Sequence, residues 1–284
     1  METSEIDLIV SKNQLSFDFE SVSTGEEEQS SLPSTAFETQ EFDWVKEKTL
    51  FVAIDVKGNS FCLDLKNLMF CGKSPLEWLV MASGGCETKV IEDDDNIIAR
   101  LKQIQTDKEF IAVFYSDTPL VDKTLFARIM NYFSRNRLNG MSLPRGYVFR
   151  TSFLSGLEDF MGGLIEKFEE KAFTQLSSAD SYNEIYTTLK GKILNYHIAG
   201  GVVILDKETT VIDADVEIES GVIIHPNNVL LDGTIVEENV ILFEGNRISQ
   251  SIIGKGARLC GCVISKSKVG DVKLSAQVLN SEQV

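Results

Sequence analysis

Apolar residues recur at a fixed step of six in the C-terminal third of the chain. The series is Ile212, Ile218, Ile224, Leu230, Val236, Leu242 and Ile248. A helix repeats about every 3.6 residues and a strand every second residue, so neither produces this period. In a parallel β-helix with triangular coils, every sixth side chain points inward and three hexads close one turn. Polar pairs and glycines between the apolar positions, such as Asp232-Gly233, are then the corners.

The middle of the chain shows a different pattern, an alternation of strand-like and helix-like segments. Residues 49–56 and 110–115 are continuous apolar runs, which are typical of buried strands. Ser74-Pro75 predicts a helix start, with Ser as the N-cap and Pro as the first helical residue. Further strands are predicted at 88–92 and 147–150, and helices at 96–104, from a Thr118 cap to about Arg135, at 152–173 and at 181–198. This alternation predicts a three-layer α/β sandwich with a mostly parallel sheet.

These patterns divide the chain into three parts. Residues 1–45 are acidic and rich in Ser, Thr, Glu and Gln, with Lys12 as the only positive charge. Such a segment buries too little apolar surface to order itself, so we expect a disordered or loosely attached arm. Residues 46–200 form the predicted α/β domain. Residues 201–284 form the predicted β-helix of about three coils, with the last residues folding back as a cap.

The composition limits the classes of partner. A net charge of −16 repels nucleic acid, so no nucleic-acid partner is expected. A local basic patch can still favour a nucleotide or sugar phosphate; a solvated basic face fits the pattern equally well. The residues of this patch are Lys66, Lys73, Arg135, Arg137 and Arg145. The sequence has no run of eighteen apolar residues and no signal-peptide pattern, so we expect no membrane partner and a cytoplasmic location.

Two short clusters suggest a metal site but have simpler explanations. Cys260-Gly-Cys262 has metal or redox spacing, but no second cysteine or histidine pair matches it. The five cysteines are therefore expected to be reduced thiols, mostly within the core. The acidic run at residues 92–95 can bind a cation, or can be a solvated loop between a strand and a helix.

The C-terminal third resembles the bacterial bifunctional N-acetylglucosamine-1-phosphate uridylyltransferase/glucosamine-1-phosphate acetyltransferase family. The best match covers residues 193–271 and includes a drop to a five-residue step at Ile248–Ile253 and again at Leu259–Ile264–Val269. The resemblance, to a shortened and divergent member, implies a reduced Rossmann-like nucleotidyltransferase domain followed by a short left-handed parallel β-helix. It also implies homo-oligomers formed through the β-helix.

Three segments of the α/β region are similar to signatures of that family. They are Gly72-Lys73-Ser74-Pro75, the run from Phe114 through Asp117 to Leu120, and Arg145-Gly146-Tyr147. The resemblance implies that Asp117 binds Mg²⁺ and that Lys66 and Lys73 are catalytic, phosphate-contacting lysines. It implies substrate-binding roles for Gly72, Thr118, Arg145 and Gly146. Considered alone, Asp117 is equally well explained as a loop carboxylate near a helix N-terminus.

Departures from the family pattern weigh against catalysis. One glycine, Gly58, follows the first strand where the family has a Gly-rich phosphate-binding loop. The family's second metal ligand falls on Ser177, and the coils that carry its acetyl-coenzyme A site have no counterpart in this sequence. His225 lies at a predicted corner and His197 on an apolar helix, so acetyl transfer is not expected. Two hypotheses remain: a divergent sugar-1-phosphate nucleotidyltransferase of the UDP-N-acetylglucosamine pyrophosphorylase type, and a non-catalytic binding or assembly module that retains the fold.

Overall fold

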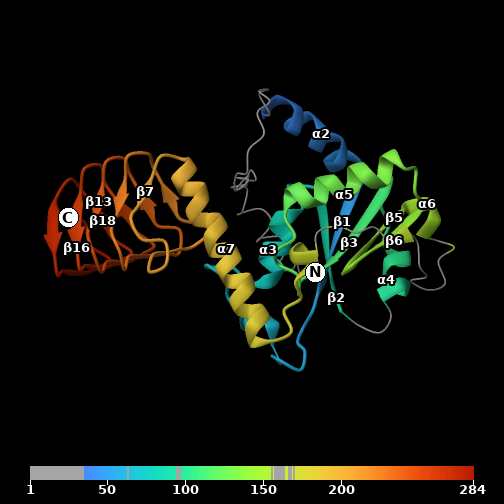
Figure 1. Cartoon of the computed structure of the whole chain (residues 1–284), viewed down its shortest axis with the longest axis horizontal. Coiled ribbons are helices and arrows are strands. Elements are labelled where there is room, and N and C mark those ends of the chain that lie inside the picture. The colour runs from blue at the N-terminus through green and yellow to red at the C-terminus, as the bar shows by residue number, and fades with distance from the viewer. Residues whose placement is uncertain are drawn as a thin grey trace, which may run out of the picture. The chain divides into compact units, whose positions relative to one another are not determined.

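The computed structural model of the chain describes residues 35–62, 64–93, 97–154, 156, 164–165, 168 and 170–284 (Figure 1). These residues form two compact units. Unit 1 contains the residues up to Leu68 together with Ser74–Tyr182, and unit 2 contains Met69–Lys73 together with Asn183–Val284. The division falls at Tyr182 rather than at the predicted residue 200, because helix α7 (Ala179–Ala199) continues into unit 2.

The predicted N-terminal arm overlaps a helix. Residues 1–34 lie outside the described residues, and helix α2 (Thr35–Lys48) follows them. Phe42 and Val45 of α2 are buried in the core of unit 1, and the ring of Phe42 meets that of Phe126 edge-on at 6.2 Å. The predicted boundary at residue 45 is therefore wrong, since the apolar side chains of this helix belong to the folded unit.

Unit 1 is built on a six-stranded mixed sheet with the order β2-β1-β3-β5-β4-β6. Its strands are β1 (Thr49–Asp55), β2 (Glu87–Glu92), β3 (Phe110–Tyr115), β4 (Gly140–Leu143), β5 (Gly146–Arg150) and β6 (Leu164–Ile165). Strand β1 pairs in parallel with β2 and β3, whereas β5 runs antiparallel to both β3 and β4. The prediction of a mostly parallel sheet is thus correct for its centre and wrong for the β4–β5 hairpin. The four residues of β4 gave no recognisable strand pattern.

Aromatic side chains fill the core on one face of this sheet. Phe51 of β1 stacks on Phe114 of β3 with ring centroids 5.2 Å apart, and it meets Phe126 edge-on at 5.1 Å. Leu79 belongs to the same buried cluster. Because successive side chains of a strand alternate between the two faces of a sheet, half of the side chains of each central strand point toward this face. All residues of β1 and β3 are buried, so the other face is covered as well.

The helix predictions differ in accuracy. The remaining helices are α3 (Pro75–Ala82), α4 (Ile97–Gln103), α5 (Lys123–Arg135), α6 (Thr151–Leu154), and the 3₁₀ turns η1 (Leu65–Asn67) and η2 (Glu170–Phe173). Ser74 caps α3 as predicted, in a capping box with Glu77. The predicted Thr118 cap is wrong, because the Asp122 side chain accepts the hydrogen bond at the start of α5. The helix predicted at 152–173 lies partly outside the described residues, and it is wrong for the rest, since α6 ends at Leu154 and β6 (Leu164–Ile165) is a strand.

Unit 2 is a parallel β-helix with three sheets, two of five strands and one of four. Its strands are β7 (Val203–Ile204), β8 (Val211–Ile212), β9 (Glu217–Ile218), β10 (Ile223–Ile224), β11 (Val229–Leu231), β12 (Ile235–Val236), β13 (Ile241–Leu242), β14 (Arg247–Ser249), β15 (Ile252–Ile253), β16 (Arg258–Cys260), β17 (Val263–Ser265), β18 (Lys268–Val269), β19 (Lys273–Ser275) and β20 (Val278–Asn280). The predicted inward residues stack in register, for example Ile212 on Leu230 and Leu230 on Ile248. The fold class is confirmed, and the left-handed sense of the coil stays a prediction from the resemblance.

The β-helix is longer than predicted. Strands β19 and β20 extend two of the ladders, and Lys268 pairs with Gln283 on the third face. The predicted ending at about three coils with a folded-back cap is therefore wrong. The sequence held a signal for this, because Val269, Leu274 and Leu279 continue the five-residue step of the preceding coil.

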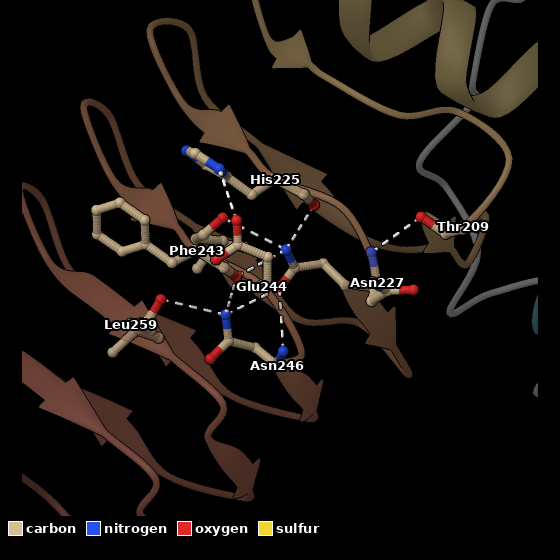
Figure 2. A network of polar contacts seen from close by, with 9 residues as sticks. Thr209, His225, Asn227, Phe243, Glu244, Asn246 and Leu259 are labelled. Atoms are coloured by element: carbon tan, nitrogen blue, oxygen red, sulfur yellow. Dashed lines mark hydrogen bonds and ion pairs between the residues drawn. The ribbon is translucent and has the colours of Figure 1, made fainter.

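A polar ladder that contains Asn228 and Asn246 runs inside the β-helix. Asn246 donates hydrogen bonds to Asn228 Oδ1 (2.9 Å) and to the carbonyls of Phe243 (2.7 Å) and Leu259 (3.2 Å). Its side-chain oxygen accepts a hydrogen bond from Cys262 N, one coil further on. Figure 2 shows Asn246 beneath the contact between His225 and Glu244 and between consecutive coils. Buried amide groups are thus satisfied by the neighbouring coil.

None of the helices in the described part of the chain has the length and hydropathy that crossing a membrane requires.

Candidate functional site

Two buried carboxylates lie at the carboxyl ends of adjacent parallel strands in unit 1. Asp55 is the last residue of β1, and Asp117 follows β3 by two residues. Strand register pairs Ile54 with Tyr115, and Ser116 N donates to the carbonyl of Ile54. Ligands of α/β sheets bind at this edge, so these two carboxylates define the candidate site.

Asp117 is held by two side chains. Arg145 donates from Nε to Asp117 Oδ1 (3.1 Å) and from Nη2 to Oδ2 (2.9 Å), in a two-pronged ion pair. Gln175 Nε2 donates to the same Oδ2 at 2.6 Å. The Asp117 side chain is 1% exposed, whereas that of Arg145 is 31% exposed. A buried carboxylate therefore anchors a partly exposed cation.

The guanidinium group is also fixed by an aromatic ring. Its central carbon lies 3.9 Å from the centroid of the Tyr115 ring, the geometry of a cation–π contact. Burial and the neighbouring Tyr147 raise the pKa of Tyr115 to about 12, although Arg145 lowers it. The phenol is therefore neutral at physiological pH. Tyr115 thus supports the guanidinium with its ring face rather than with a charge.

Asp55 forms the second pair, with the predicted catalytic residue Lys66. Lys66 Nζ lies 2.8 Å from Asp55 Oδ2, and the lysine side chain is 51% exposed. The hydrogen bond to Asp55 raises the pKa of Lys66, so its ammonium group is charged at neutral pH. The backbone N–H of Lys66 donates to Asp64, which caps the short turn η1. Lys66 thus lies at the sheet edge beside Asp55, and its predicted catalytic role stays a prediction.

The loop after β1 satisfies many of its own backbone donors. Phe61 N and Cys62 N both donate to Asn59 Oδ1, at 2.9 and 3.0 Å. The Asn59 side-chain amide in turn donates to the carbonyl of Leu176 at 2.6 Å. Val56 N donates to Ser116 Oγ. These N–H groups are therefore occupied, at the place where the resemblance implied a phosphate cradle.

Thr118 and Gly146, two of the predicted substrate-binding residues, have structural contacts. Thr118 is buried, and its hydroxyl donates to the carbonyl of Tyr115 at 2.9 Å. A Cβ on Gly146 would lie 2.5 Å from the carbonyl oxygen of Val113. Glycine is therefore required for β5 to approach β3 at this point.

Gly72 and Lys73 belong to unit 2, in a tight turn in which Phe70 and Lys73 exchange backbone hydrogen bonds. Gly72 has φ +82° and lies against Asp213 of the β-helix, where a Cβ would be 2.8 Å from the carboxyl carbon. Lys73 is buried, and its charge offsets part of the rise that burial causes in the pKa of Asp213. The predicted contacts of Gly72 and Lys73 with a substrate stay predictions.

The predicted basic patch is only partly found beside the two buried carboxylates. Lys66 and Arg145 form the ion pairs of these carboxylates, whereas Arg135 is the last residue of α5 and Arg137 follows that helix. All five cysteines are free thiols. His197 is buried, and burial lowers its pKa to about 4. Part of the acidic run at 92–95 lies outside the described residues, and Glu92 pairs with Lys57 at 2.9 Å.

The donors around Asp117 do not fit the implied Mg²⁺. A carboxylate is a suitable ligand in type, with metal–oxygen distances of about 2.1 Å. Both oxygens of Asp117, however, accept hydrogen bonds from Arg145 and Gln175. Ser177, at the position of the implied second ligand, donates its hydroxyl to the carbonyl of Gln175. Across the residues described, no group of three or more His, Cys, Asp and Glu side chains is arranged to hold a metal.

Asp55 and Gln175 are the site residues that the sequence analysis missed. Asp55 ends a buried strand just as Asp117 follows one, so its position was a usable signal. Gln175 lies in no recognisable motif, and it reaches Asp117 because Leu176 N donates to the carbonyl of Asp117 at 2.7 Å.

Parts of the chain are similar in sequence to known proteins. No protein-family model matches the chain. The chain is 32% identical to the bifunctional protein GlmU of Clostridium acetobutylicum over 141 residues, covering 49% of this chain and 30% of the relative. It is 40% identical to that of Clostridium perfringens over 111 residues, covering 39% and 24%. The chain thus spans less than a third of the length of these relatives, and the similarity supports a GlmU-like family at this coarse level.

Among solved structures, that of Rv0371c from Mycobacterium tuberculosis H37Rv covers 49% of this chain and 98% of its own, with 13% identity and a TM-score of 0.36. So loose an overlap supports no argument about fold or function.

Proposed function

We propose that unit 1 is a binding module for a nucleotide or sugar phosphate. In this proposal it derives from a sugar-1-phosphate nucleotidyltransferase of the UDP-N-acetylglucosamine pyrophosphorylase type and has lost the transfer reaction. The single observation that supports it most is the engagement of Asp117 by Arg145 and Gln175. Lys66 and Arg145 supply two partly exposed positive charges at the edge where α/β sheets bind ligands.

The chemistry of transfer explains why catalysis is excluded from the proposal. Nucleotidyl transfer needs a carboxylate-bound Mg²⁺, backbone N–H groups around the phosphates, and a cation beside the bridging oxygen. Of these three, Lys66 fits the last. Each lost transition-state donor costs roughly 3–4 kcal/mol, a factor of several hundred in rate. Loss of the metal and of the N–H groups near Asn59 together would leave negligible turnover.

A paired assay on the full chain tests this function. Calorimetric titration with UTP, ATP and UDP-N-acetylglucosamine measures binding, and pyrophosphate release from UTP with a hexosamine 1-phosphate measures transfer. We expect binding without pyrophosphate release. Lys66→Met should weaken binding about 5- to 20-fold through the lost charge on phosphate. Lys207→Met, which removes an exposed lysine of unit 2, is the matched control and should change nothing.

Two results would contradict the proposal. Pyrophosphate release that disappears in Asp117→Ala would establish an enzyme, and absence of binding by every nucleotide tested would remove the binding role. A cytoplasmic location, where such ligands are available, is part of the same proposal. Acetyl transfer is not.

Assembly through the β-helix is a second function that we propose, on a separate observation. The outward side chains of one coil, Ile223, Val229 and Ile235, are all β-branched and partly exposed. In the coil of β16 to β18 the corresponding positions are Arg258, Val263 and Lys268. A ring of aliphatic side chains around one coil favours contact with further copies of the chain.

Sedimentation velocity tests this second role. We expect Ile223→Lys to reduce the proportion of oligomer by at least about tenfold, since a buried charge opposes association. Val278→Lys is the matched control, because Val278 is an outward residue of the last coil and is 73% exposed. A monomeric wild-type chain at micromolar concentration would contradict the role in assembly.

A further inference from the structure

The Asp117 carboxylate is paired with a side-chain cation, Arg145, at the position where the resemblance implied a metal ion. Three hydrogen bonds reach its two oxygens, at 3.1, 2.9 and 2.6 Å, and two of them come from the guanidinium group of Arg145. The side chain of Asp117 is 1% exposed. A buried carboxylate needs a compensating charge, and here the chain itself supplies it.

Arg145 is held in place from three directions. Asp117 fixes its Nε and Nη2 atoms, and the ring of Tyr115 lies under its plane at 3.9 Å. The next residue, Gly146, is held against the carbonyl of Val113 by a contact that leaves no room for a side chain. The guanidinium is therefore preorganised, and its ordering cost is met before any ligand arrives.

One edge of the guanidinium remains available. The hydrogen bonds to Asp117 use Nε and Nη2, and Nη1 has no acceptor among the residues that the structure describes. With 31% of its side chain exposed, Arg145 can present Nη1 to a ligand oxygen. A planar, permanently charged donor of this kind suits phosphate and carboxylate groups.

We infer that the Arg145 guanidinium, fixed on Asp117, replaces the divalent cation of a nucleotidyltransferase site, so that anionic ligands bind without metal. The ligand class rests on the proposed function, whereas the exclusion of metal from Asp117 does not. A divalent cation would have to displace the guanidinium from a buried carboxylate and leave the two positive charges adjacent. Removing one partner from a buried pair is strongly unfavourable, so the metal is excluded at ordinary concentrations.

Mn²⁺ binding to the full chain, followed by water-proton relaxation, tests the exclusion directly. The wild-type chain and Asp117→Asn should give the same titration. Arg145→Gln frees the carboxylate and should add about one Mn²⁺ per chain, because a hard oxygen ligand becomes available. The double variant Arg145→Gln/Asp117→Asn should lose that site again. Arg150→Gln is the matched control, since Arg150 ends β5, pairs with Glu109 just before β3, and lies outside the site.

Two results would overturn the inference. One is wild-type Mn²⁺ binding that is lost in Asp117→Asn, and the other is a folded Arg145→Gln variant that gains no Mn²⁺ site. Should Arg145→Gln fail to fold, the comparison of wild type with Asp117→Asn still decides, because neither carries that substitution.

A calorimetric titration with UTP separates this inference from the proposed function. We expect the UTP affinity of the wild-type chain to differ by less than about threefold between EDTA and Mg²⁺, because Arg145 supplies the local charge. UTP binding that requires Mg²⁺ would overturn the inference and leave the binding role intact. Absence of UTP binding under both conditions would end the binding role, while the Mn²⁺ titrations would still test metal exclusion.

Discussion

The interior of the β-helix and the edge of the α/β sheet both bury polar groups, but they satisfy them differently. In the β-helix, each Asn of the ladder bonds to its counterpart or to backbone groups in the next coil. At the sheet edge, Asp55 pairs with Lys66, whereas Asp117 is held by Arg145 and Gln175, which are distant in sequence. In a repeat, each coil therefore supplies an equivalent hydrogen-bond partner to the next coil. In the site, each carboxylate depends on particular side chains that occur once in the chain.

The largest expected effect comes from removing a member of the Asn ladder. Asn246→Ala deletes the hydrogen bonds to Asn228, Phe243 and Leu259 and leaves Cys262 N without its acceptor. Each buried group left unsatisfied costs about 1–3 kcal/mol, so we expect a loss of about 3–5 kcal/mol in the free energy of unfolding. Urea denaturation followed by circular dichroism measures it.

Asn195→Ala, an exposed position on α7, is the control for this prediction and should leave the unfolding midpoint unchanged. If Asn246→Ala also left the unfolding midpoint unchanged, the ladder would not stabilise the coil.

A smaller effect is expected at the sheet edge. Asp117→Ala removes three hydrogen bonds and leaves Arg145 without its partner, but that side chain is partly exposed and regains water. We therefore expect a loss of about 1.5–3 kcal/mol, measured by thermal and urea unfolding. Glu92→Ala breaks the exposed pair with Lys57 on the same edge and should give no measurable change. Equal effects for the two variants would contradict the account of Asp117.

Asp213 in unit 2 makes the stability of the β-helix depend on pH. Burial raises the pKa of Asp213 to about 6 from 3.8, with help from Asp215 and Asp232. The folded state therefore holds a proton that the unfolded state has released, and wild-type stability should fall as pH rises from about 4 to about 6. Asp213→Asn cannot ionise, so at pH 8 it should be more stable than wild type by about 1–3 kcal/mol.

The Asp213→Asn advantage should vanish near pH 4, where both side chains are neutral. Unfolding curves at pH 4, 6 and 8 check this. A difference between the two proteins that is independent of pH would show that Asp213 does not titrate in this range.

The smallest effect is expected at the exposed Lys255–Glu238 pair of the β-helix. Exposed ion pairs gain little because water screens them. Lys255→Ala should leave the melting temperature unchanged within error in a calorimetric scan. A clear loss of stability would mean that side chains on the β-helix surface contribute as its interior does.

The same contrast explains what the sequence could predict. The inward positions from Ile212 to Val269 were predictable because they recur at a step of six, with a drop to five at Ile248–Ile253 and at Leu259–Val269. Strands β1 and β3 were predictable because both are continuous apolar runs. The final strands β19 and β20 were less predictable although Leu274 and Leu279 follow the five-residue step, since the residues between these two leucines are mostly polar or small and are equally typical of a folded-back cap.

The site was less predictable because its contacts are neither local nor periodic. Asp117 and Arg145 were both identified, but as a metal ligand and a substrate contact rather than as partners of each other. Their pairing depends on the β4–β5 hairpin, whose strand β4 has only four residues. Gln175 lies 58 residues from Asp117, and nothing in the intervening sequence indicates that they meet.

Crystallographic anomalous scattering from crystals of the full chain soaked in Mn²⁺ tests the central claim most directly. The account predicts that Arg145 remains within hydrogen-bond distance of both oxygens of Asp117, with no anomalous peak beside them. An Mn²⁺ peak at about 2.1–2.2 Å from Asp117, with the guanidinium displaced, would contradict it.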